Sequence, residues 1–371
     1  MKNILFRRSS IALLVVLALT ATSCKVGRFV YYNFANITDY KIFPSRTAAA
    51  NAASVYHYPA SAKPKFPKSL QLGDKDIAFD DFLAQHKTVA FLIIKNDSLQ
   101  YEKYFSGYNE ASLVASFSMA KSLTSILIGC ALEDGLIKSV EEPVVSYIPE
   151  LKNEGMDKVT IKHLLQMTSG IKFNESYINP FGDAATYYYG TNIKKAIYKR
   201  KLINQPGTTF SYSSGDTQML GLVLERALKG KTITAYLEEK IWKPLGMEYD
   251  ATWSMDREKD GIEKTFGSIN ARARDFAKLG SLYLHNGSWN GKQIVSKEWV
   301  ALSTTADLTE GGVPYYKYQW WLQANGSYMA QGILGQYVYV CPAKNLVIVR
   351  LGKDYGNVEW ENLFASLANS Y

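Results

Sequence analysis

Residues 115–135 read ASFSMAKSLTSILIGCALEDG, and they place a serine and a lysine at the start of an apolar run with helical spacing. Ser118 and Lys121 are three positions apart, so their side chains share one face if a helix begins near the serine. A hydroxyl is a poor nucleophile until a base takes its proton, and Lys121 is positioned to be that base. The stretch predicts a serine nucleophile, and the alternative is a solvated lysine in the first turn of a helix that stops at Gly135.

The start of that helix supplies an environment suited to the chemistry. Its free backbone N–H groups and the positive end of its dipole favour an oxyanion and disfavour an ammonium group. We therefore expect the pKa of Lys121 to be shifted toward the neutral, basic form. A second S-x-x-K sequence runs from Ser169 to Lys172, but it lies where a predicted helix breaks at Gly170, so the required geometry is absent there.

A second stretch adds a candidate proton carrier. QPGTTFSYSSGDTQMLG (205–221) puts Tyr212 after a Pro-Gly turn and before an amphipathic helix. A tyrosine there can relay a proton between Ser118, Lys121 and a leaving group if the neighbouring lysine lowers its pKa. The chain has 26 tyrosines, so an ordinary core or surface tyrosine is the alternative.

Five sequences together carry a resemblance: SFSMAKSLTS, IKHLLQMTSGI, PGTTFSYSSGDTQMLGLVLERA, KPLGM and GQYVYVCP. In this order they resemble the β-lactamase-related serine hydrolases of the class C type, which include β-lactamases, D-alanyl-D-alanine carboxypeptidases, esterases and 6-aminohexanoate-dimer hydrolases. The likeness covers roughly residues 75–370. It implies that Ser118 is acylated, that Lys121 is its base partner and that Tyr212 is a second general base or acid. It implies no metal and no organic cofactor.

The chain departs from the family pattern at its second motif. The usual Tyr-x-Asn reads Tyr212-Ser213-Ser214 here, a variant similar to the 6-aminohexanoate-dimer hydrolase branch. Ser214 can still donate a hydrogen bond, so the resemblance implies a substrate-binding role for it. Asn270, in GSINARARD, matches a family position that opens a helix near the site, which implies substrate binding; capping that helix is the alternative.

The third motif, usually Lys-Thr-Gly or His-x-Gly, best matches Ala330-Gln331-Gly332. Gly332 lets substrate approach the strand edge, and the resemblance implies an oxyanion hole made of the N–H groups of Ser118 and Ile333. The leading cation is absent, so one group fewer can hold the carboxylate of a β-lactam or a D-alanyl peptide. Esterase or amidase activity on a small-molecule substrate therefore ranks above β-lactamase or D-Ala-D-Ala carboxypeptidase activity.

A different class of function stays open. A lipoprotein that keeps the penicillin-recognising fold but only binds cell-wall peptides or a protein partner would also fit the lost cation and the Asn-to-Ser change. Retention of Ser118, Lys121 and Tyr212 together argues against this second hypothesis. The aromatic residues 187–189 and 316–321 can line an acyl or amine pocket, with core packing as their alternative role.

The N-terminus predicts export. MKNILFRRSS is a positive segment, and the eleven residues IALLVVLALTA are too few for a membrane span, which needs about 20. Thr22 and Ser23 before Cys24 resemble a bacterial lipobox, with Ala21 in place of the usual leucine. We expect residues 1–24 to be a lipoprotein signal peptide and Cys24 to carry a lipid anchor to the membrane. This makes the protein a periplasmic or outer-membrane lipoprotein of the bacterial cell envelope; an ordinary cleaved signal is the alternative.

The order of the elements predicts the fold class. Residues 25–70 read as an extended leader that wraps or tethers the domain, and residues 89–105 as a hairpin around the turn Asn96-Asp97-Ser98. Helical patterns dominate the middle of the chain, and strands return after residue 316. We therefore expect an α/β (α+β) fold in which an antiparallel sheet, flanked by helices, carries an inserted all-helical domain. The sheet part is residues 71–117 and 256–371, and the helical part is 118–255.

Composition excludes several other classes. The chain has 371 residues with 47% hydrophobic and 20% charged residues, which is ordinary for a globular protein. Three of its eight net positive charges lie in residues 1–24, and the remaining +5 forms no basic, aromatic-interleaved cluster for nucleic acid. The four histidines are scattered and predict no metal site. Cys130 and Cys341 lie in apolar runs and read as buried small hydrophobes, with a disulfide between them left open.

Overall fold

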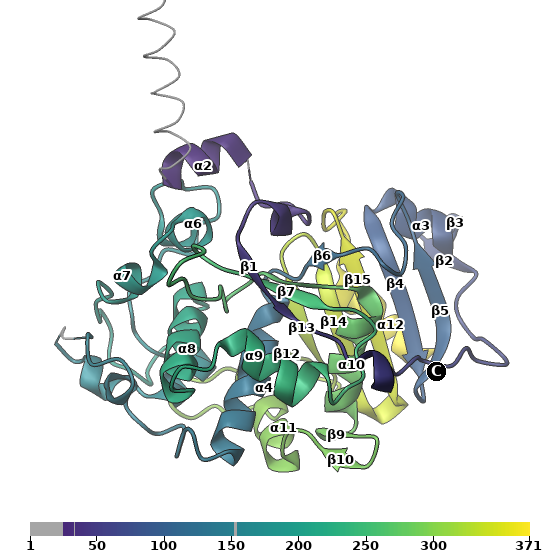
Figure 1. Cartoon of the computed structure of the whole chain (residues 1–371). Coiled ribbons are helices and arrows are strands. Elements are labelled where there is room, and N and C mark those ends of the chain that lie inside the picture. Colours follow the sequence, from purple (N-terminus) through teal and green to yellow (C-terminus); the bar gives the residue numbers. More distant parts are fainter. Residues whose placement is uncertain (1–24, 33, 152–153) are drawn as a thin grey trace, which may run out of the picture.

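The computed structural model describes residues 25–32, 34–151 and 154–371, so the predicted signal peptide and Cys24 lie outside the described residues. Its largest element is a seven-stranded antiparallel sheet built from both ends of the sequence (Figure 1). The strand order is β11 (Tyr316–Lys317), β12 (Trp320–Leu322), β13 (Tyr328–Gly332), β14 (Gln336–Cys341), β15 (Leu346–Gly352), β4 (Thr88–Lys95) and β5 (Ser98–Tyr104). The expected antiparallel sheet is confirmed.

The central strands are buried on both faces. Along β15, Leu346 and Ile348 join one hydrophobic cluster while Val347 and Val349 join the other. Successive side chains of a strand point to opposite faces, so this alternation means that the sheet separates two cores. The β4–β5 hairpin turns at Asn96 and Asp97, which both have positive φ (49° and 55°) as the predicted turn requires.

Helices cover both faces of the sheet. On one face α10 (Ala273–Leu284) packs against β4, β14 and β15, and Gly280 lets it come close to the valine side chains of the sheet. On the other face lie α3 (Phe79–Gln85) and α12 (Trp360–Asn369), whose residues Phe82 and Phe364 belong to the second core. The two short hairpin pairs are β2 (Ser69–Leu72) with β3 (Lys75–Ala78), and β9 (Ser288–Trp289) with β10 (Lys292–Gln293).

Residues 118–250 are mainly helical and lie beside the sheet (Figure 1). Their helices are α4 (Met119–Glu133), α5 (Ile161–Gln166), α6 (Asp183–Tyr189), α7 (Ile193–Ile197), α8 (Ser214–Ala227) and α9 (Ile233–Leu237). Helix α4 lies at the junction, since it contacts both α8 and strand β13. The junction therefore brings the Ser118 region next to the strand that holds the third motif.

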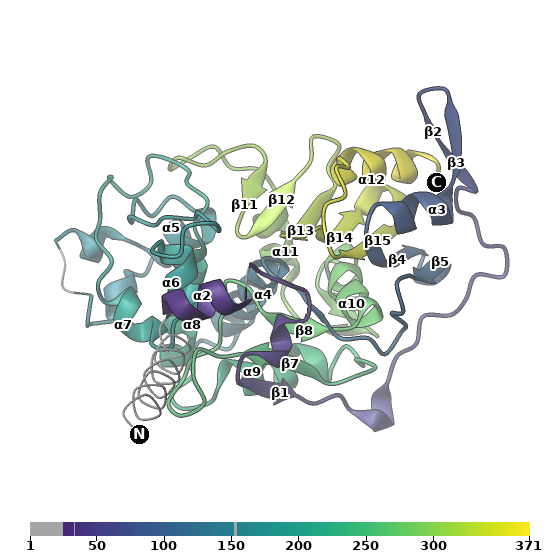
Figure 2. The ribbon, with the colours of Figure 1, turned by 90° about the horizontal axis from the view of Figure 1, so that it is seen from above.

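The described leader runs along the rest of the chain and is not wholly extended. It contains α2 (Lys25–Tyr32) and β1 (Ser45–Ala48) before it runs along one side of the molecule to the β2–β3 hairpin (Figure 2). Strand β1 joins a second sheet of order β1–β7–β8–β6, with β7 at Ala251–Ser254, β8 at Ile269–Ala271 and β6 at Val114–Ala115. Thus β7 lies inside the range expected to be helical. Across the described residues, no helix has both the length and the apolarity needed to cross a membrane.

Some elements differ from the sequence-based expectation in their ends. The run 316–323 is a hairpin of two short strands, because Tyr318 and Gln319 take positive φ (41° and 72°) and turn the chain between β11 and β12. Helix α5 is capped by Thr160 and ends at Gln166, before the expected break at Gly170, since Met167 already adopts a left-handed conformation. Helix α11 (Lys297–Thr304), capped by Ser296, was not anticipated. Cys130 and Cys341 are buried free thiols, which excludes the disulfide.

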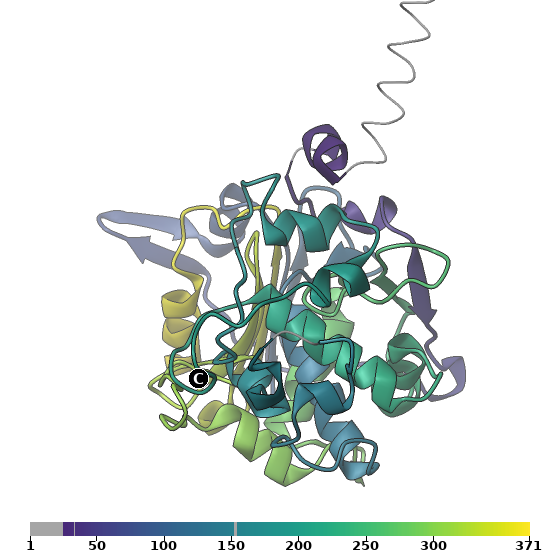
Figure 3. The same cartoon turned by 90° about the vertical axis from the view of Figure 1, so that its left-hand side faces the viewer.

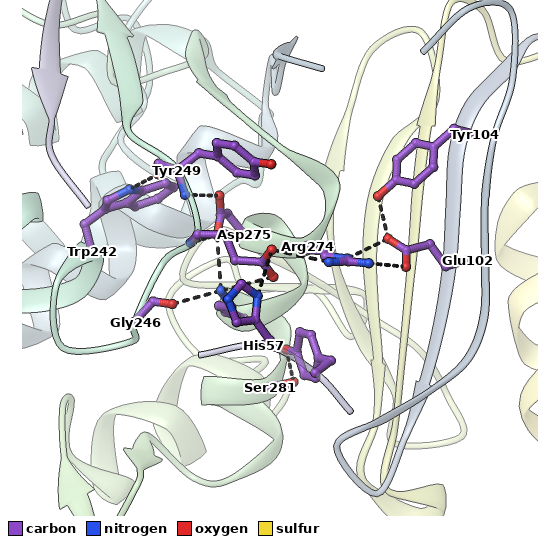
Figure 4. Close-up of polar contacts among 12 residues, drawn as sticks. His57, Glu102, Tyr104, Trp242, Gly246, Tyr249, Arg274, Asp275 and Ser281 are labelled. Carbon is purple, nitrogen blue, oxygen red and sulfur yellow. Dashed lines mark hydrogen bonds and ion pairs between the residues drawn. The ribbon is translucent and has the colours of Figure 1, made fainter. Parts of the chain in front are cut away.

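A buried ionic cluster fastens α10 to the chain on either side of it (Figure 4). Asp275 accepts the backbone N–H groups of Glu248 (2.7 Å) and Tyr249 (3.3 Å), and Lys278 donates to the Gly246 carbonyl (2.9 Å). Arg274 forms a bidentate ion pair with Glu102 of β5, and both N–O distances are 2.7 Å. The cluster links α10 to the turn before β7 and to the edge of the large sheet.

Candidate active site

Ser118 is presented by a strained turn. The chain leaves β6, passes through Phe117 with φ +47°, and enters α4 at Ser118, the residue that precedes its first full turn. A non-glycine residue in the left-handed region costs free energy and persists where the surrounding structure holds it. The turn places Ser118 at the positive end of α4, as the sequence predicts.

Lys121 lies against the Ser118 hydroxyl. Its Nζ is 3.1 Å from Ser118 Oγ, 3.0 Å from Ser214 Oγ and 2.6 Å from the carbonyl oxygen of Phe266. The lysine is 2% exposed, and within the described part of the chain no carboxylate is in direct contact with its side-chain nitrogen. The structure thus brings the serine and the lysine of the S-x-x-K sequence within proton-transfer distance.

Glu175 completes this arrangement and was not anticipated. Its carboxylate accepts the Ser214 hydroxyl proton (2.6 Å) and the Ser214 backbone N–H (2.7 Å). Because the hydroxyl proton of Ser214 points to Glu175, the same oxygen can only accept from Lys121. No sequence pattern pairs residue 175 with residue 214, since the contact joins a loop to the first turn of α8.

These contacts orient the lysine in its neutral form. A neutral amine has two N–H groups and one lone pair, and two fixed acceptors are present, Ser214 Oγ and the Phe266 carbonyl. With both N–H groups bound there, the lone pair of Lys121 faces Ser118 Oγ. This orientation is what a base for the Ser118 hydroxyl requires.

The pKa of Lys121 is lowered to about 8, as expected in direction. Burial is the main cause, because it penalises the ammonium form, and the negative charge of Glu175 partly opposes the shift. The helix terminus on which the expectation rested is therefore not the main cause. With a pKa of about 8, neutral Lys121 is the minority form at neutral pH and becomes the majority form above about pH 8.

Tyr212 stacks beside the same lysine. Lys121 Nζ lies 5.2 Å from the centre of the Tyr212 ring, and the Tyr212 phenol is close enough to Ser118 for this serine to affect its pKa. The expectation that the lysine lowers the pKa of Tyr212 is wrong: burial raises the pKa, although the Ser118 contact opposes the rise. A phenol buried with few polar neighbours keeps its proton, so Tyr212 is suited to donate a proton rather than to accept one first.

Gly332 lies where β13 meets the nucleophile. A β-carbon at this position would be 2.3 Å from the Ser116 carbonyl oxygen and 3.2 Å from the Ser118 nitrogen, so only glycine fits without displacement. The close approach carries the next residue, Ile333, into the wall of the pocket that holds Ser118. The predicted residues Ser118, Gly332 and Ile333 are thus brought together, and Ser214 lines the same pocket.

The pocket beside Ser118 has a volume of about 340 Å³ and is mainly aromatic. Sixteen described residues line it; eight are aromatic and none of the sixteen is charged. Tyr188 and Tyr189 belong to this wall, whereas Tyr187 is buried in the core. Two further aromatic residues, Phe29 and Phe34, come from the leader, and sequence reasoning gave no sign of their presence here.

Asn270 is not a pocket residue, which corrects the expectation from its motif. It lies within β8, is fully buried, and its amide nitrogen donates to Thr252 and to Ser254 Oγ (3.1 and 3.2 Å). It does not cap α10 either, because that helix begins after Arg272. Asn270 therefore ties β8 to β7, since the amide points between the strands instead of toward Ser118.

The second S-x-x-K sequence has no catalytic geometry, as predicted. Ser169 Oγ donates to Asp216 (2.9 Å), and Gly170 has φ +70°, so no helix connects the serine with Lys172. Asp216 is buried and its pKa is raised to about 8 by burial. Ser169 therefore supports the start of α8.

Comparison with known proteins agrees with this geometry. The beta-lactamase family profile matches residues 77–364. The chain belongs to the beta-lactamase family. It is also 27% identical over 305 residues to a 6-aminohexanoate-dimer hydrolase of Paenarthrobacter ureafaciens, covering 74% of this chain and 76% of that protein.

Solved structures place this beta-lactamase-family chain in the same fold. A putative 6-aminohexanoate-dimer hydrolase from Bacillus anthracis superposes with a TM-score of 0.80 at 25% identity, covering 90% of this chain and 93% of the other. A putative beta-lactamase from Bacteroides dorei gives a TM-score of 0.65 at 19% identity, with 78% and 96% covered. The fold and the membership in a family of serine hydrolases related to beta-lactamases and penicillin-binding proteins are thereby established.

Proposed function

We propose that this protein hydrolyses an ester or amide bond through an acyl-enzyme on Ser118. The observation that carries the proposal is the 3.1 Å distance between Lys121 Nζ and Ser118 Oγ. When the two N–H groups of neutral Lys121 are bound to Ser214 Oγ and the Phe266 carbonyl, its lone pair faces that hydroxyl. The lowered pKa of Lys121, about 8, makes that lone pair available near neutral pH. The 6-aminohexanoate-dimer hydrolase relative adds support for a hydrolase, since its name describes cleavage of a dimer.

In the proposed acylation step, neutral Lys121 takes the Ser118 proton as Oγ bonds to the substrate carbonyl carbon. The carbonyl π electrons move onto its oxygen, where the N–H groups of Ser118 and Ile333 stabilise the negative charge. Collapse of this intermediate breaks the bond to the leaving group. Tyr212 donates its proton to the leaving oxygen or nitrogen and regains one from protonated Lys121.

In the proposed deacylation, water is the nucleophile and Ser118 Oγ is the leaving group. Water enters at the acyl carbonyl, gives its proton through Tyr212 and Lys121, and the new intermediate expels Ser118 Oγ, which is reprotonated. The product is the free acid. The net reaction consumes one water and leaves the protein unchanged.

The pocket favours an uncharged acyl group. None of its sixteen described lining residues is charged, and Ala330 stands where related enzymes carry a cation. A β-lactam or D-alanyl carboxylate would lose its water shell there without gaining an ionic partner. We therefore rank esterase or amidase activity above β-lactamase and carboxypeptidase activity, and we place the reaction in the bacterial cell envelope on the basis of the N-terminal sequence.

A fluorophosphonate probe tests the nucleophile. We expect the wild-type protein to be labelled and to hydrolyse p-nitrophenyl butyrate faster than any member of a chromogenic cephalosporin panel. Ser118→Ala should lose labelling and at least 1,000-fold of the ester activity, a loss in the range found when an activated nucleophile is removed.

Ser169→Ala is the matched control, because it removes the serine of the other S-x-x-K sequence. It should keep the label, with folding of each variant checked by circular dichroism. Absence of labelling and turnover in wild type would instead favour a protein that only binds cell-wall peptides or a partner. Faster cephalosporin than ester turnover would overturn the substrate ranking.

A further inference from the structure

Exposed apolar side chains gather at one place on the described surface. Eleven large apolar residues are exposed, and seven of them belong to three short segments that all reach the Ser118 pocket. One of these seven residues is Tyr355, which is 39% exposed. The other six form what we call the mouth patch: Val30, Tyr31, Phe34, Tyr177, Ile178 and Phe181. Ile178 and Phe181 are 76% and 75% exposed, a large apolar exposure for neighbouring side chains.

The patch is built from two stretches of sequence that carry no charge. FVYYNFANIT (29–38) comes from the leader and SYINPFG (176–182) from the loop before α6. Helix α2 packs against α6, so the two stretches meet at one end of the molecule (Figure 3). Apolar and aromatic residues on adjoining, uncharged segments indicate contact with something other than water.

The patch and the pocket are continuous. Phe34 and Tyr177 are partly exposed, yet both also line the cavity that contains Ser118. Phe29 turns inward from the same helix and contacts Tyr189 of the wall, with ring centres 5.5 Å apart. An apolar molecule can therefore pass from the patch to the nucleophile without crossing a charged surface among these residues.

We propose that the mouth patch docks on a lipid bilayer and that the hydrolase draws an amphiphilic, acyl-bearing ester from it. This rests on the proposed hydrolase function and adds the source and class of substrate. The acyl chain enters the aromatic pocket while the polar part of the ester stays at the surface. A membrane-partitioned ester is then preferred over a water-soluble one.

The bilayer is favoured over a second copy of the chain by the position of the leader. The predicted lipidation site Cys24 directly precedes the described helix α2 (Lys25–Tyr32), which rises about 9 Å over the six residues from Lys25 to Tyr31. A lipid on Cys24 would therefore hold the α2 part of the patch close to the bilayer surface. Tyrosine and phenylalanine at the rim match the aromatic composition of protein surfaces at membrane interfaces.

The test uses the full chain in vesicles of phosphatidylethanolamine and phosphatidylglycerol. Two rates are compared: hydrolysis of a p-nitrophenyl ester with a long acyl chain dissolved in the vesicles, and hydrolysis of soluble p-nitrophenyl acetate. We expect Ile178→Ser/Phe181→Ser to lose at least fivefold on the vesicle ester and less than twofold on the acetate. The matched control Leu302→Ser/Leu308→Ser removes exposed leucines elsewhere and should keep both rates.

Equal rates of the patch variant and wild type on the vesicle ester would overturn the proposal. A loss of both rates in the patch variant, with a native circular dichroism spectrum, would also overturn it, because the patch would then serve the reaction itself. Absence of any turnover by wild type is a different outcome, since it rejects the proposed hydrolase function and not the docking surface.

A second measurement reports docking without catalysis. Ile178→Cys is labelled with the fluorophore NBD; Cys130 and Cys341 are buried, and wild type treated in the same way measures any label that Cys24 takes up. Lipids that carry a doxyl quencher should reduce its fluorescence at least twofold, whereas Leu308→Cys labelled in the same way should be unaffected. Equal quenching at both positions, or self-association of the labelled protein without quenching, would contradict docking on the bilayer.

Discussion

The Ser214 hydroxyl orients the side-chain nitrogen of Lys121, the proposed base for the Ser118 proton. Ser214 Oγ donates its hydrogen bond to Glu175 (2.6 Å), so toward Lys121 (3.0 Å) it can only accept one. Asparagine, the family's usual residue here, would bring both a donor and an acceptor of its own. Ser214 has a single hydroxyl, and the carboxylate of Glu175 sets the direction in which it donates. We therefore propose that Glu175 is a positioning residue.

The pH dependence of the ester reaction follows from the pKa of Lys121. Only the neutral lysine can take the Ser118 proton, so kcat/KM should rise with pH and level off above about pH 8. Glu175 raises that pKa, so Glu175→Gln should move the rise to lower pH. The variant also loses one of the two carboxylate oxygens that hold Ser214, and we expect the plateau of kcat/KM to fall about tenfold, the equivalent of roughly 1.4 kcal/mol.

Glu310→Gln is the matched control, because Glu310 is exposed and pairs with Lys162 outside the pocket. Its pH–rate profile should coincide with that of wild type. A profile of Glu175→Gln that shifts to higher pH, or one that keeps the wild-type plateau, would show that the carboxylate does not act through Ser214 and Lys121.

At this scale the sequence predicts the residues that we propose to react but not those that orient them. Ser118 and Lys121 follow from helical spacing, and Tyr212 follows from its motif. Glu175 lies in a loop without a periodic pattern, and its partner is 39 residues away. Asn270 shows the reverse error, since its motif suggested a site residue while its neighbours in β7 hold it within a sheet.

Among the elements, α10 depends most clearly on buried charge. Asp275 and Lys278 are both fully buried on this helix, and their charged groups are 3.3 Å apart. The carboxylate also holds two backbone N–H groups of the turn before β7. Breaking such a group by removing one partner leaves an unpaired charge and unsatisfied donors in the interior.

Asp275→Ala should therefore lower the free energy of unfolding by about 3–5 kcal/mol, measured by urea denaturation. The double variant Asp275→Ala/Lys278→Met should recover part of the loss, because it removes a buried ammonium group that would keep only its 3.6 Å ion pair with Glu248. Glu239→Ala breaks the exposed Lys231–Glu239 pair and serves as control, with an expected cost below about 1 kcal/mol. A single variant as stable as the control would contradict the role given to the cluster.

Elements with strong local signals were predictable from the sequence, and those formed by distant contacts were not. The β4–β5 hairpin follows from its turn residues and α4 from its apolar spacing and Gly135. The short strand β1 could not be foreseen, because Ser45–Ala48 becomes a strand only by pairing with β7, some 200 residues later. Its ladder runs from Ser45 opposite Ser254 to Ala48 opposite Ala251.

The sheet and the helical region share one core. The larger hydrophobic cluster includes side chains of α4 and α8 together with inward residues of β4 and β15, while the opposite faces of those same strands form the second cluster. Neither region can lose its packing without exposing apolar surface of the other. We therefore expect a single cooperative unfolding transition.

Two buried cysteines allow the predicted single unfolding transition to be tested. Cys130 lies in α4 within the first cluster, and Cys341 lies in β14 within the second. In urea, both thiols should become reactive toward Ellman's reagent at the same midpoint, followed one at a time in the Cys24→Ser/Cys341→Ser and Cys24→Ser/Cys130→Ser variants. Reaction of Cys130 at a clearly lower urea concentration would mean that the helical region unfolds alone.

The fold class was predictable at the scale of the whole molecule, because strand signals at both ends and helical signals between them have few antiparallel solutions. The course of residues 25–70 was not. An aperiodic, aromatic segment gives no indication of what it covers, and only the packing of α2 on α6 reveals that it closes the Ser118 pocket.

Because the leader forms part of the pocket wall, it affects how the substrate preference of the protein should be measured. Phe29 and Phe34 belong to the cavity wall although they precede the domain that the family profile matches, which starts at residue 77. A shortened form trimmed to the matched region would retain Ser118, Lys121 and Tyr212 and could still be acylated, but its acyl site would lack one side. Substrate profiles recorded on such a form would describe a wider and wetter cavity than the one the native protein offers.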